Sequence, residues 1–326
     1  MRIKNIQEKK ISVVMCTYNG EKYIREQIDS IVSQSYPIYE FIIQDDCSTD
    51  NTLNIIQEYA KKYSYIKVYQ NPCNIGFNQN FKQVILKAKG DFIAISDQDD
   101  IWYKEKLKKQ IEVIGEYSLC TSERHRDPIY NANFMTQVIK PIISFEYLLF
   151  TNSIPGHSML LEKKFAHGVI SKWNAQIIYD WWFSINAHLH KGIICINEPL
   201  NWHRPHNNSI ISLCLAKNNI DLTLKQTWQS YIYGYKAYRK LQQLPNWNFL
   251  YRHTFNNTSP SSNPLIHILS NLLLKKNIPS LFYLCWLCLL NRDTINPCKK
   301  NKSFIYLLRS FFCPLIRAYT NKVFYL

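Results

Sequence analysis

Residues 11–36 read ISVVMCTYNGEKYIREQIDSIVSQSY, and this stretch decides the fold. Its opening is an apolar run rich in β-branched residues, which predicts a strand over Ile11–Cys16. The turn cluster Thr17-Tyr-Asn-Gly20 follows, and apolar residues at helical spacing then predict a helix over Tyr23–Val32. The stretch therefore predicts a strand, a loop and a helix in succession.

The same pattern recurs as far as residue 100. Strands separated by helix-length segments predict a parallel, right-handed α/β sheet. Ligands bind such sheets at the carboxyl ends of the strands, so the loops that follow the strands are the candidate site. The further expected strands are Tyr39–Ile43, Ile66–Tyr69 and Phe92–Ser96, and the further helices are near Asn51–Lys62 and Asn78–Lys89.

Acidic residues dominate two of these loops, 44–50 and 97–100. An Asp-x-Asp sequence places two carboxylates on one face of an extended segment, which suits a divalent cation such as Mg²⁺ or Mn²⁺ that bridges a diphosphate. Asp and Ser clusters also serve as ordinary turn and N-cap residues, which is the alternative for either loop alone. Two acidic loops at one sheet edge favour the metal. The sequence contains neither a P-loop nor a dinucleotide-binding glycine motif.

Charge is unevenly distributed along the 326 residues. The formal net charge is +15, but residues 236–326 hold 13 basic residues and one acidic residue, Asp293, so they carry +12 of it. Nucleic-acid phosphate and an anionic membrane surface are both common partners of such a segment, and composition does not choose between them. The 46% hydrophobic and 14% aromatic content excludes a disordered or low-complexity chain.

The ten cysteines have no repeating spacing, which favours reduced thiols in a cytosol over a disulfide framework. Cys285 and Cys288 have redox or zinc spacing, but they lie in an apolar run without a second ligand pair, so we expect buried thiols. The polar N-terminus does not resemble a signal peptide, and no apolar run reaches the ~18 residues of a membrane span. We therefore expect a cytoplasmic protein.

At this point the sequence resembles the family-2 glycosyltransferases with the GT-A fold, in particular the bacterial branch of rhamnosyltransferases and other surface-polysaccharide assembly enzymes. Three motifs carry the resemblance in the family's order: residues 11–36, QDDCSTDNT (44–52) and SDQDDIW (96–102). Residues 152–165 and 178–209 resemble the acceptor-side half of the same branch.

The resemblance implies an α/β protein whose GT-A (Rossmann-like), mostly parallel sheet is flanked by helices, with a C-terminal helical extension. Residues 1–215 would form the catalytic domain and residues 216–326 a basic, aromatic helical region. The implied activity is inverting, metal-dependent transfer of a hexosyl group, with rhamnose as one candidate, from a nucleotide-diphosphate donor to a saccharide acceptor in bacterial surface polysaccharide synthesis. The alternative is a catalytically silent member that binds saccharides or nucleotide sugars in an assembly complex.

The resemblance also implies roles for individual residues. Asp99 and His206 would bind the metal, Mg²⁺ or Mn²⁺. Nucleotide-sugar binding is implied for Thr17, Tyr18, Asn19, Asp45, Asp46, Asp97, Asp99, Arg204 and His206.

The acceptor side includes the implied catalytic base, Asp180. Direct displacement at the anomeric carbon requires such a base to remove the proton of the acceptor hydroxyl; the alternative for Asp180 is an N-cap of the helix that follows. The neighbouring Trp181 and Trp182 suit sugar stacking, although two adjacent residues on a helix face different directions. Gly156 and His157 would line the acceptor cleft.

One segment departs from the family pattern, because residues 114–141 are short and polar where the family has a further strand. This departure puts activity in doubt. In the C-terminal third we expect a helix over 221–243, a loop over Pro245–Asn263, and apolar helices over Leu265–Leu274, Ile278–Leu290 and Ser303–Ile316.

The basic borders of these short apolar helices favour peripheral attachment to the cytoplasmic face of the inner membrane, where a lipid-linked acceptor would lie. A helical subdomain packed on the sheet is the alternative, and nucleic-acid binding ranks third.

Overall fold

The computed structural model describes residues 9–131, 135–173, 177–205, 225–297, 304–320 and 324, with side chains from residue 229 onward in the fourth range. The chain forms two compact units. It passes from one unit to the other after residues 141, 153, 175, 189 and 205, and the expected division at residue 215 stays a prediction. Unit 1 comprises Met1–Pro141, Ile154–Ala175 and His190–Pro205, and unit 2 comprises Ile142–Ser153, Gln176–Leu189 and His206–Leu326.

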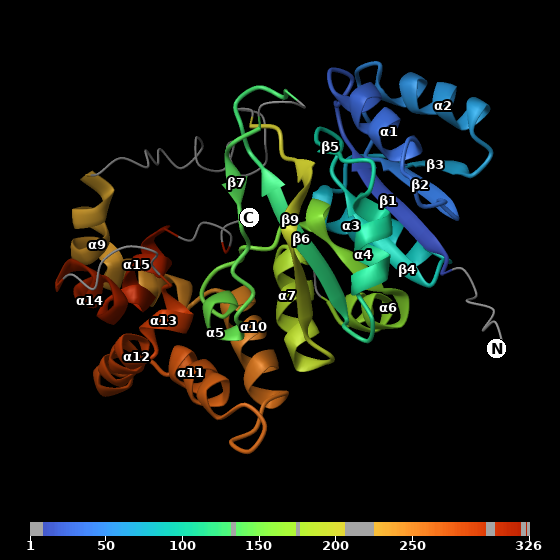
Figure 1. The fold of residues 1–326 in the computed structure, drawn as a ribbon. Helices are drawn as coiled ribbons and strands as arrows, with labels where there is room; N and C mark the ends of the chain where they lie inside the picture. Colours follow the sequence, from blue (N-terminus) through green and yellow to red (C-terminus); the bar gives the residue numbers. More distant parts are fainter. Residues whose placement is uncertain are drawn as a thin grey trace, which may run out of the picture. The chain divides into compact units, whose positions relative to one another are not determined.

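The parallel half of the sheet in unit 1 forms as the sequence predicts (Figure 1). Its strand order is β3-β2-β1-β4, and all neighbours are parallel. Every residue of β1, β2 and β4 is buried, as expected for strands whose two faces are both covered. The elements are β1 (Ile11–Thr17), α1 (Ile24–Val32), β2 (Glu40–Asp45), α2 (Thr52–Lys62), β3 (Ile66–Gln70), α3 (Phe77–Lys87) and β4 (Phe92–Ser96).

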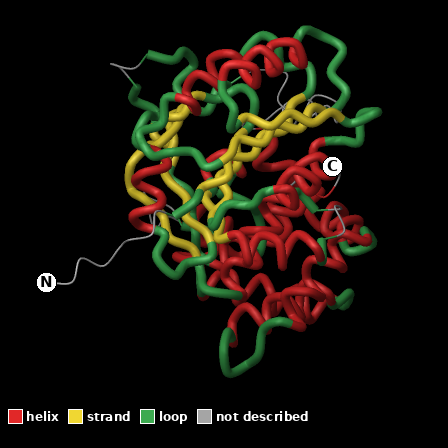
Figure 2. Tube along the Cα trace, turned by 90° about the vertical axis from the view of Figure 1, so that its right-hand side faces the viewer, coloured by secondary structure: helices red, strands yellow, loops and turns green. Residues whose placement is uncertain are grey.

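Further strands extend the sheet beyond β4 in the order β8-β6-β9-β5, and β7 pairs with β6. β8 is antiparallel to both β4 and β6, so the sheet is mixed, although β6 and β9 are again parallel. Figure 2 shows the strands as one twisted band with helices beside it. These elements are β5 (Ile101–Trp102), α4 (Lys106–Val113), β6 (Leu119–His125), β7 (Val138–Ile139), η1 (Gly156–Ser158), β8 (Leu160–Glu162), α6 (Lys163–Ser171) and β9 (Ile193–Trp202).

The expectation that residues 114–141 lack a strand is wrong. β6 lies in this segment and pairs with β7, β8 and β9. One of its buried hydroxyls is paired, because Thr121 Oγ1 lies 2.8 Å from Ser158 Oγ in η1. The buried Ser122 Oγ has no hydrogen-bond partner among the described residues. The departure from the family pattern is therefore one of composition and not of a missing strand.

Unit 2 is helical. The expected helices near 221–243, 265–274 and 278–290 are confirmed as α9 (Lys225–Leu241), α11 (Pro264–Leu274) and α12 (Ile278–Leu290). The expected loop Pro245–Asn263 is wrong over its first part, which forms α10 (Pro245–Asn256), and Ser303–Ile316 is divided between two helices. The remaining elements are α5 (Phe145–Leu148), α7 (Tyr179–Leu189), α13 (Arg292–Ile295), α14 (Phe304–Phe311) and α15 (Cys313–Thr320).

Among the described residues, no helix combines the length and the apolar character that a membrane span requires. Cys285 and Cys288 are free thiols buried in unit 2, as their apolar surroundings in the sequence predict.

Candidate active site

The loops after β1 and β2 are joined because Thr17 and Asp45, which end these parallel strands, are register partners. Thr17 Oγ1 donates a hydrogen bond to Asp45 Oδ1 at 2.9 Å. The Asn19 N–H donates to Ser48 Oγ at 2.9 Å, and Asn19 Oδ1 accepts from the Thr49 N–H at 2.8 Å. Asn19 has a φ of 47°, a left-handed conformation that asparagine adopts more readily than most residues.

Asp45 and Asp46 are both buried, and both carboxylates bind the protein itself. Asp45 accepts hydrogen bonds from the backbone N–H and the hydroxyl of Ser48, at 2.9 and 2.6 Å. Asp46 accepts from the backbone N–H groups of Ile75 and Gly76, each at 2.9 Å. These two acids therefore organise the loops, and their expected contacts with a nucleotide sugar stay predictions.

Tyr18 connects the first loop to the acidic loop 97–100. Its N–H donates to Gln98 Oε1 at 2.9 Å, and Gln98 Nε2 donates to the Tyr18 carbonyl at 3.1 Å. A Cβ at Gly20 would lie 2.4 Å from Gln98 Oε1, so a larger residue here would displace the Gln98 amide from Tyr18. The Tyr18 side chain is 46% exposed, which leaves its ring accessible at the edge of the sheet.

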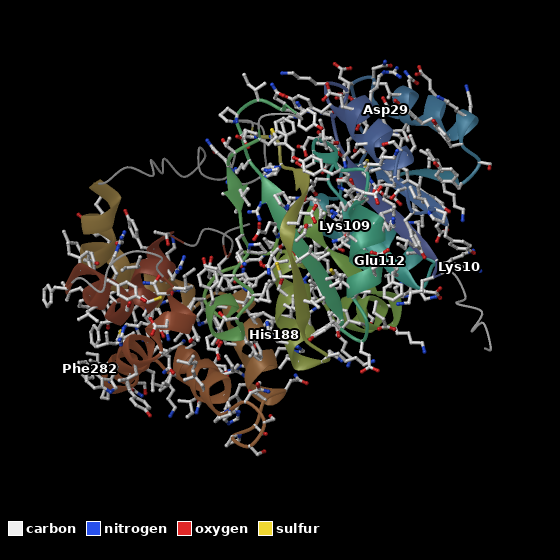
Figure 3. The ribbon with its side chains drawn as sticks, viewed as in Figure 1. Lys10, Asp29, Lys109, Glu112, His188 and Phe282 are labelled. Atoms are coloured by element: carbon white, nitrogen blue, oxygen red, sulfur yellow. The ribbon has the colours of Figure 1, made fainter. Side chains whose placement is uncertain are left out.

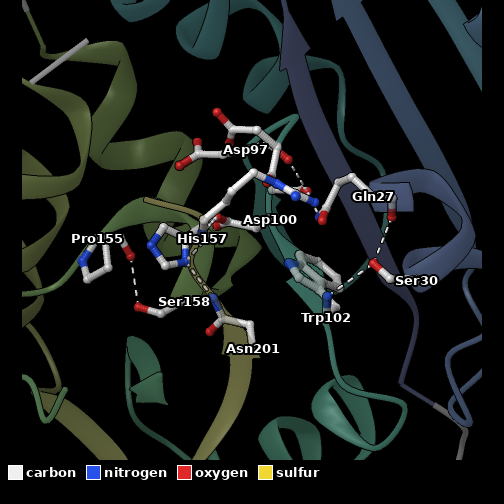
Figure 4. Close-up of polar contacts among 12 residues, drawn as sticks. Gln27, Ser30, Asp97, Asp100, Trp102, Pro155, His157, Ser158 and Asn201 are labelled. Carbon is white, nitrogen blue, oxygen red and sulfur yellow. Dashed lines mark hydrogen bonds and ion pairs between the residues drawn. The ribbon is translucent and has the colours of Figure 1, made fainter. Parts of the chain in front are cut away.

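Asp97, Asp100 and His157 form the one group of metal-ligating side chains found among the described residues. One ligand atom from each lies within 4.8 Å of the other two. Asp100 and His157 are buried, and Asp100 Oδ2 is 3.2 Å from His157 Nδ1. Asn201, on β9, places Nδ2 at 2.8 Å from the same Nδ1 (Figure 4). Three separate segments of unit 1 therefore build the group.

The surroundings of this group favour its uncharged forms. Burial, followed by the carboxylates of Asp99 and Asp97, raises the pKa of Asp100 well above its ordinary value. Burial, followed by the neighbouring His203 and other basic groups, lowers the pKa of His157. A metal cation, by contrast, is attracted to this site, because clustered carboxylates stabilise a positive charge among them.

The donor set fits a hard divalent cation, since carboxylate oxygens and an imidazole nitrogen are common ligands of Mg²⁺ and Mn²⁺. Asp100 Oδ2 and His157 Nε2 are buried and have no hydrogen-bond partner within the part of the chain that the structure describes. Asp99, the expected principal metal ligand, is outside this group, and His206 lies outside the described residues. Both expected ligands stay predictions.

Two buried cations lie near the acidic group. Lys106, the first residue of α4, has Nζ 4.8 Å from the centre of the Trp102 ring, and no described acceptor bonds it. Burial lowers the pKa of Lys106 to about 7. On β6, burial and the nearby Arg126 lower the pKa of Arg124 to about 10. Both cations interact electrostatically with Asp100.

Arg204, expected to bind the nucleotide sugar, contacts the acidic loop and holds it in place in the structure. Its guanidinium lies 4.4 Å from the centre of the Tyr23 ring and 4.6 Å from that of Trp202. Nε donates to the Asp99 carbonyl at 2.8 Å, and the Arg204 backbone N–H donates to Asp100 Oδ1 at 3.1 Å. The geometry of Asp-x-Asp thus depends on Arg204, whose expected nucleotide contact stays a prediction.

Asp180 is in the first turn of α7, in unit 2, and its Oδ1 accepts the Trp181 N–H at 2.7 Å. The Trp181 ring is buried, and its Nε1 donates to the Leu148 carbonyl at 2.6 Å. Trp182 is also buried, with ring centres 5.1 Å from Phe249 and 4.4 Å from His253. Both indoles therefore pack inside unit 2, and their expected stacking on a sugar is untested.

Sequence reasoning assigned Gly156 and His157 to the acceptor cleft, and the structure places both, buried, in η1. Sequence reasoning placed Asp100 in the acidic loop 97–100 without a role of its own, and it did not assign Lys106 or Arg124 to the site. The sequence did point to Asp100, because it is the third acid of the motif SDQDDIW. Nothing in the sequence pointed to Lys106 or Arg124, because only the folded sheet brings them toward Asp100.

A model of the family described as "Glycosyl transferase family 2" matches residues 12–167. The chain is 33% identical to the teichuronic acid biosynthesis glycosyltransferase TuaG of Bacillus subtilis, over 68% of this chain and 86% of that protein. It is 31% identical to the dTDP-rhamnosyl transferase RfbG of Shigella flexneri, over 60% and 72%. A mannosyltransferase of Pyrobaculum calidifontis, solved with GDP-Man and Mn²⁺, shares the fold at a TM-score of 0.54 and 14% identity, over 96% of this chain and 86% of that one. The chain belongs to glycosyl transferase family 2.

Proposed function

We propose that this protein transfers a sugar, with inversion, from a nucleoside-diphosphate donor to a saccharide acceptor in the synthesis of a bacterial surface polysaccharide. The observation that carries this proposal is the group Asp97, Asp100 and His157, which lies where the parallel strands of an α/β sheet end. The names of TuaG and RfbG support a polysaccharide product and a nucleotide-sugar donor.

In this proposal, the loops after β1, β2 and β4 bind the donor. Asp97, Asp100 and His157 would hold Mg²⁺ or Mn²⁺, with Asp99 and His206 as further predicted ligands. The cation, when bound, supplies positive charge that stabilises the leaving diphosphate. The exposed ring of Tyr18 is suited to stack on a base, and the buried Asp45 keeps the loop beneath it in place.

Asp180 is the base in this proposal. Its carboxylate removes the proton of the acceptor hydroxyl, the acceptor oxygen forms a bond to the anomeric carbon, and the bond from that carbon to the diphosphate breaks. The Trp181 N–H holds one carboxylate oxygen in place, while the buried indole of Trp181 fixes the start of α7.

We further propose that the acceptor is lipid-linked and that the protein works at the cytoplasmic face of the inner membrane. The basic residues 236–326 support this location, because an anionic membrane surface attracts them.

The test is transfer from a panel of UDP-, dTDP- and GDP-sugars, with and without Mg²⁺ or Mn²⁺, read by mass spectrometry of the products. Asp180→Asn should bind donor normally yet lose transfer by on the order of 10²-fold or more. Glu112→Gln, on the exposed face of α4, is the control and should keep full transfer. Donor binding without turnover in the unmodified protein would support a catalytically silent member instead, and full turnover in Asp180→Asn would remove Asp180 from the mechanism.

A further inference from the structure

Helix α12 of unit 2 exposes a stripe of large apolar side chains. Ile278 is 70% exposed, Phe282 61%, Trp286 46% and Leu290 57%. Their spacing of four residues places them along one side of the helix, and Tyr283 adjoins them at 47%. No charged residue occurs anywhere in the 13 residues of α12. A helix that faces water normally carries polar residues on that side, so we expect this stripe to be an interaction surface.

Helix α14 differs from an ordinary surface helix because it buries hydroxyl-bearing side chains and exposes apolar ones. It buries Tyr306 and Ser310, and the Tyr306 hydroxyl donates to the Asn296 carbonyl at 3.2 Å. Its apolar residues point outward, with Phe304 73% and Ile305 64% exposed. The arrangement is stable inside the unit because the buried hydroxyls are hydrogen-bonded, yet it leaves apolar area in contact with solvent.

The two exposed sets adjoin each other. α12 packs against α14, and the Phe282 ring meets the Phe311 ring edge to face at 5.6 Å between centres. Figure 3 labels Phe282 on the outer side of α12. We call the exposed apolar residues of α12 and α14 the α12–α14 face.

Basic residues border the α12–α14 face. Lys275 and Lys276 are exposed and directly precede the first turn of α12, and Arg309 is exposed on α14 itself. Only one acidic residue, Asp293, occurs in the whole of 236–326. The face therefore combines aromatic and aliphatic side chains with a positively charged border.

This chemistry decides between two occupants. A second copy of the chain would bring two strongly positive regions together, and like charges across an interface oppose association. An anionic bilayer instead attracts the border, while Trp, Tyr, Phe and Leu enter the boundary between headgroups and acyl chains. We propose that the α12–α14 face docks flat on an anionic lipid bilayer, with its apolar side chains buried about 5–10 Å into the interface.

This proposal deepens the proposed location at a membrane and rests on it, but it does not depend on catalysis. Its test reads vesicle binding without any sugar donor, so a failure here leaves the transfer assay untouched. Full-length protein is floated with vesicles of phosphatidylglycerol mixed with phosphatidylcholine, and with vesicles of phosphatidylcholine alone, at low and high salt.

The test variant is the double substitution Phe282→Ser with Trp286→Ser, and the charge variant is Lys275→Gln with Lys276→Gln. The matched control is Leu86→Ser with Ile129→Ser, two residues of unit 1 that are 44% and 79% exposed. We expect the unmodified protein and the control to float with anionic vesicles. The test variant should bind at least about tenfold more weakly, and the charge variant should bind more weakly and depend less steeply on salt.

Equal binding of the test variant and the control, at unchanged melting temperatures, would overturn the proposal. So would a dimer that forms without lipid and dissociates in the test variant, because a second copy would then cover the face. Absence of flotation for the unmodified protein also overturns it.

Discussion

At the scale of single residues, the buried carboxyl of Asp100 has the most direct consequence for activity. It is held by the Arg204 N–H on one oxygen and has no hydrogen-bond partner, among the described residues, on the other. Burial and the neighbouring acids raise the pKa of Asp100, so a cation that binds this oxygen beside Asp97 and His157 would displace its proton.

We expect Asp100→Asn to lower the turnover number by on the order of 10²-fold, because the amide keeps the shape of the side chain but removes an anionic ligand. Melting temperature measured with increasing Mn²⁺ provides a second readout: the metal should stabilise the unmodified protein and leave the variant unaffected. Glu112→Gln should respond to metal like the unmodified protein. An undiminished metal-induced rise in the melting temperature of Asp100→Asn would remove Asp100 from the metal site.

Lys106 should make the free energy of unfolding depend on pH. Burial lowers its folded pKa to about 7, whereas its ordinary value is 10.5, and Asp100 and Cys120 act on it in the opposite direction. Between these two values the unfolded chain binds more protons, so stability rises with pH across this window and is constant below it. Lys106→Met, of similar volume, should be more stable at pH 7 by roughly 1–4 kcal/mol and lose the slope.

Urea denaturation at several pH values between 6 and 10 measures this difference, with Lys108→Met, about half exposed on the same helix, as control. Parallel pH profiles for the unmodified protein and Lys106→Met would show that the lysine is not buried as described.

Part of the site could be predicted from sequence, because its residues lie next to strands that are themselves recognisable in the sequence. Thr17, Asn19, Asp45 and Asp97 follow strands that were themselves predicted, so parallel pairing brings them to one sheet edge. The place of His157 beside Asp100 could not be predicted, because these residues are far apart in the chain and meet only through the pairing of short strands.

At the scale of elements, α9 and α15 pack so closely that only glycine fits at one position. A Cβ on Gly234 would lie 2.9 Å from Leu315 Cβ and 3.0 Å from its carbonyl oxygen. Gly168, within α6, has nothing within 4 Å of the same position and is exposed. The two glycines therefore form a matched pair.

Gly234→Ala should destabilise the protein by about 1–3 kcal/mol, because the helices must separate to admit the methyl group. Gly168→Ala should instead stabilise it by up to about 1 kcal/mol, since alanine is the better helix former. Both changes can be measured as shifts in the urea midpoint. A gain in stability for Gly234→Ala would contradict the described contact between α9 and α15.

Elements differ in how far their sequence predicts them. β1, β2 and β4 were predicted because strands covered on both faces are continuous apolar runs. α10 was missed because Pro245 and the following asparagines suggest a loop, although proline is favourable in the first turn of a helix. β6 was missed because most of its residues are polar, so the segment lacks the apolar run that predicts a buried strand.

At the scale of the whole molecule, the two units are interleaved along the chain. α5 and α7 belong to unit 2, although they lie before residue 215 in the sequence. Their contacts are with later segments: the Tyr251 hydroxyl donates to the Leu149 carbonyl at 2.9 Å, and His253 Nε2 lies 2.8 Å from Asn186 Oδ1. The boundary expected at residue 215 separates these partners.

We expect a fragment of residues 1–215 to be poorly soluble and to bind a hydrophobic dye, because it exposes Trp181 and Trp182 without their partners. The intact chain, expressed in parallel, should remain soluble. A soluble 1–215 fragment with a cooperative thermal transition would instead support the boundary expected from sequence.

The rings of Trp181 and Phe324 are in contact, with centres 5.1 Å apart. This contact determines how late in synthesis the packing around Trp181 can be completed. A ribosome that adds about 5–20 residues per second needs roughly 7–30 s to make the 143 residues that separate them. Throughout that interval the Trp181 indole lacks its last neighbour. Chaperone binding to the nascent chain should therefore persist until Phe324 has emerged, however early the sheet has formed.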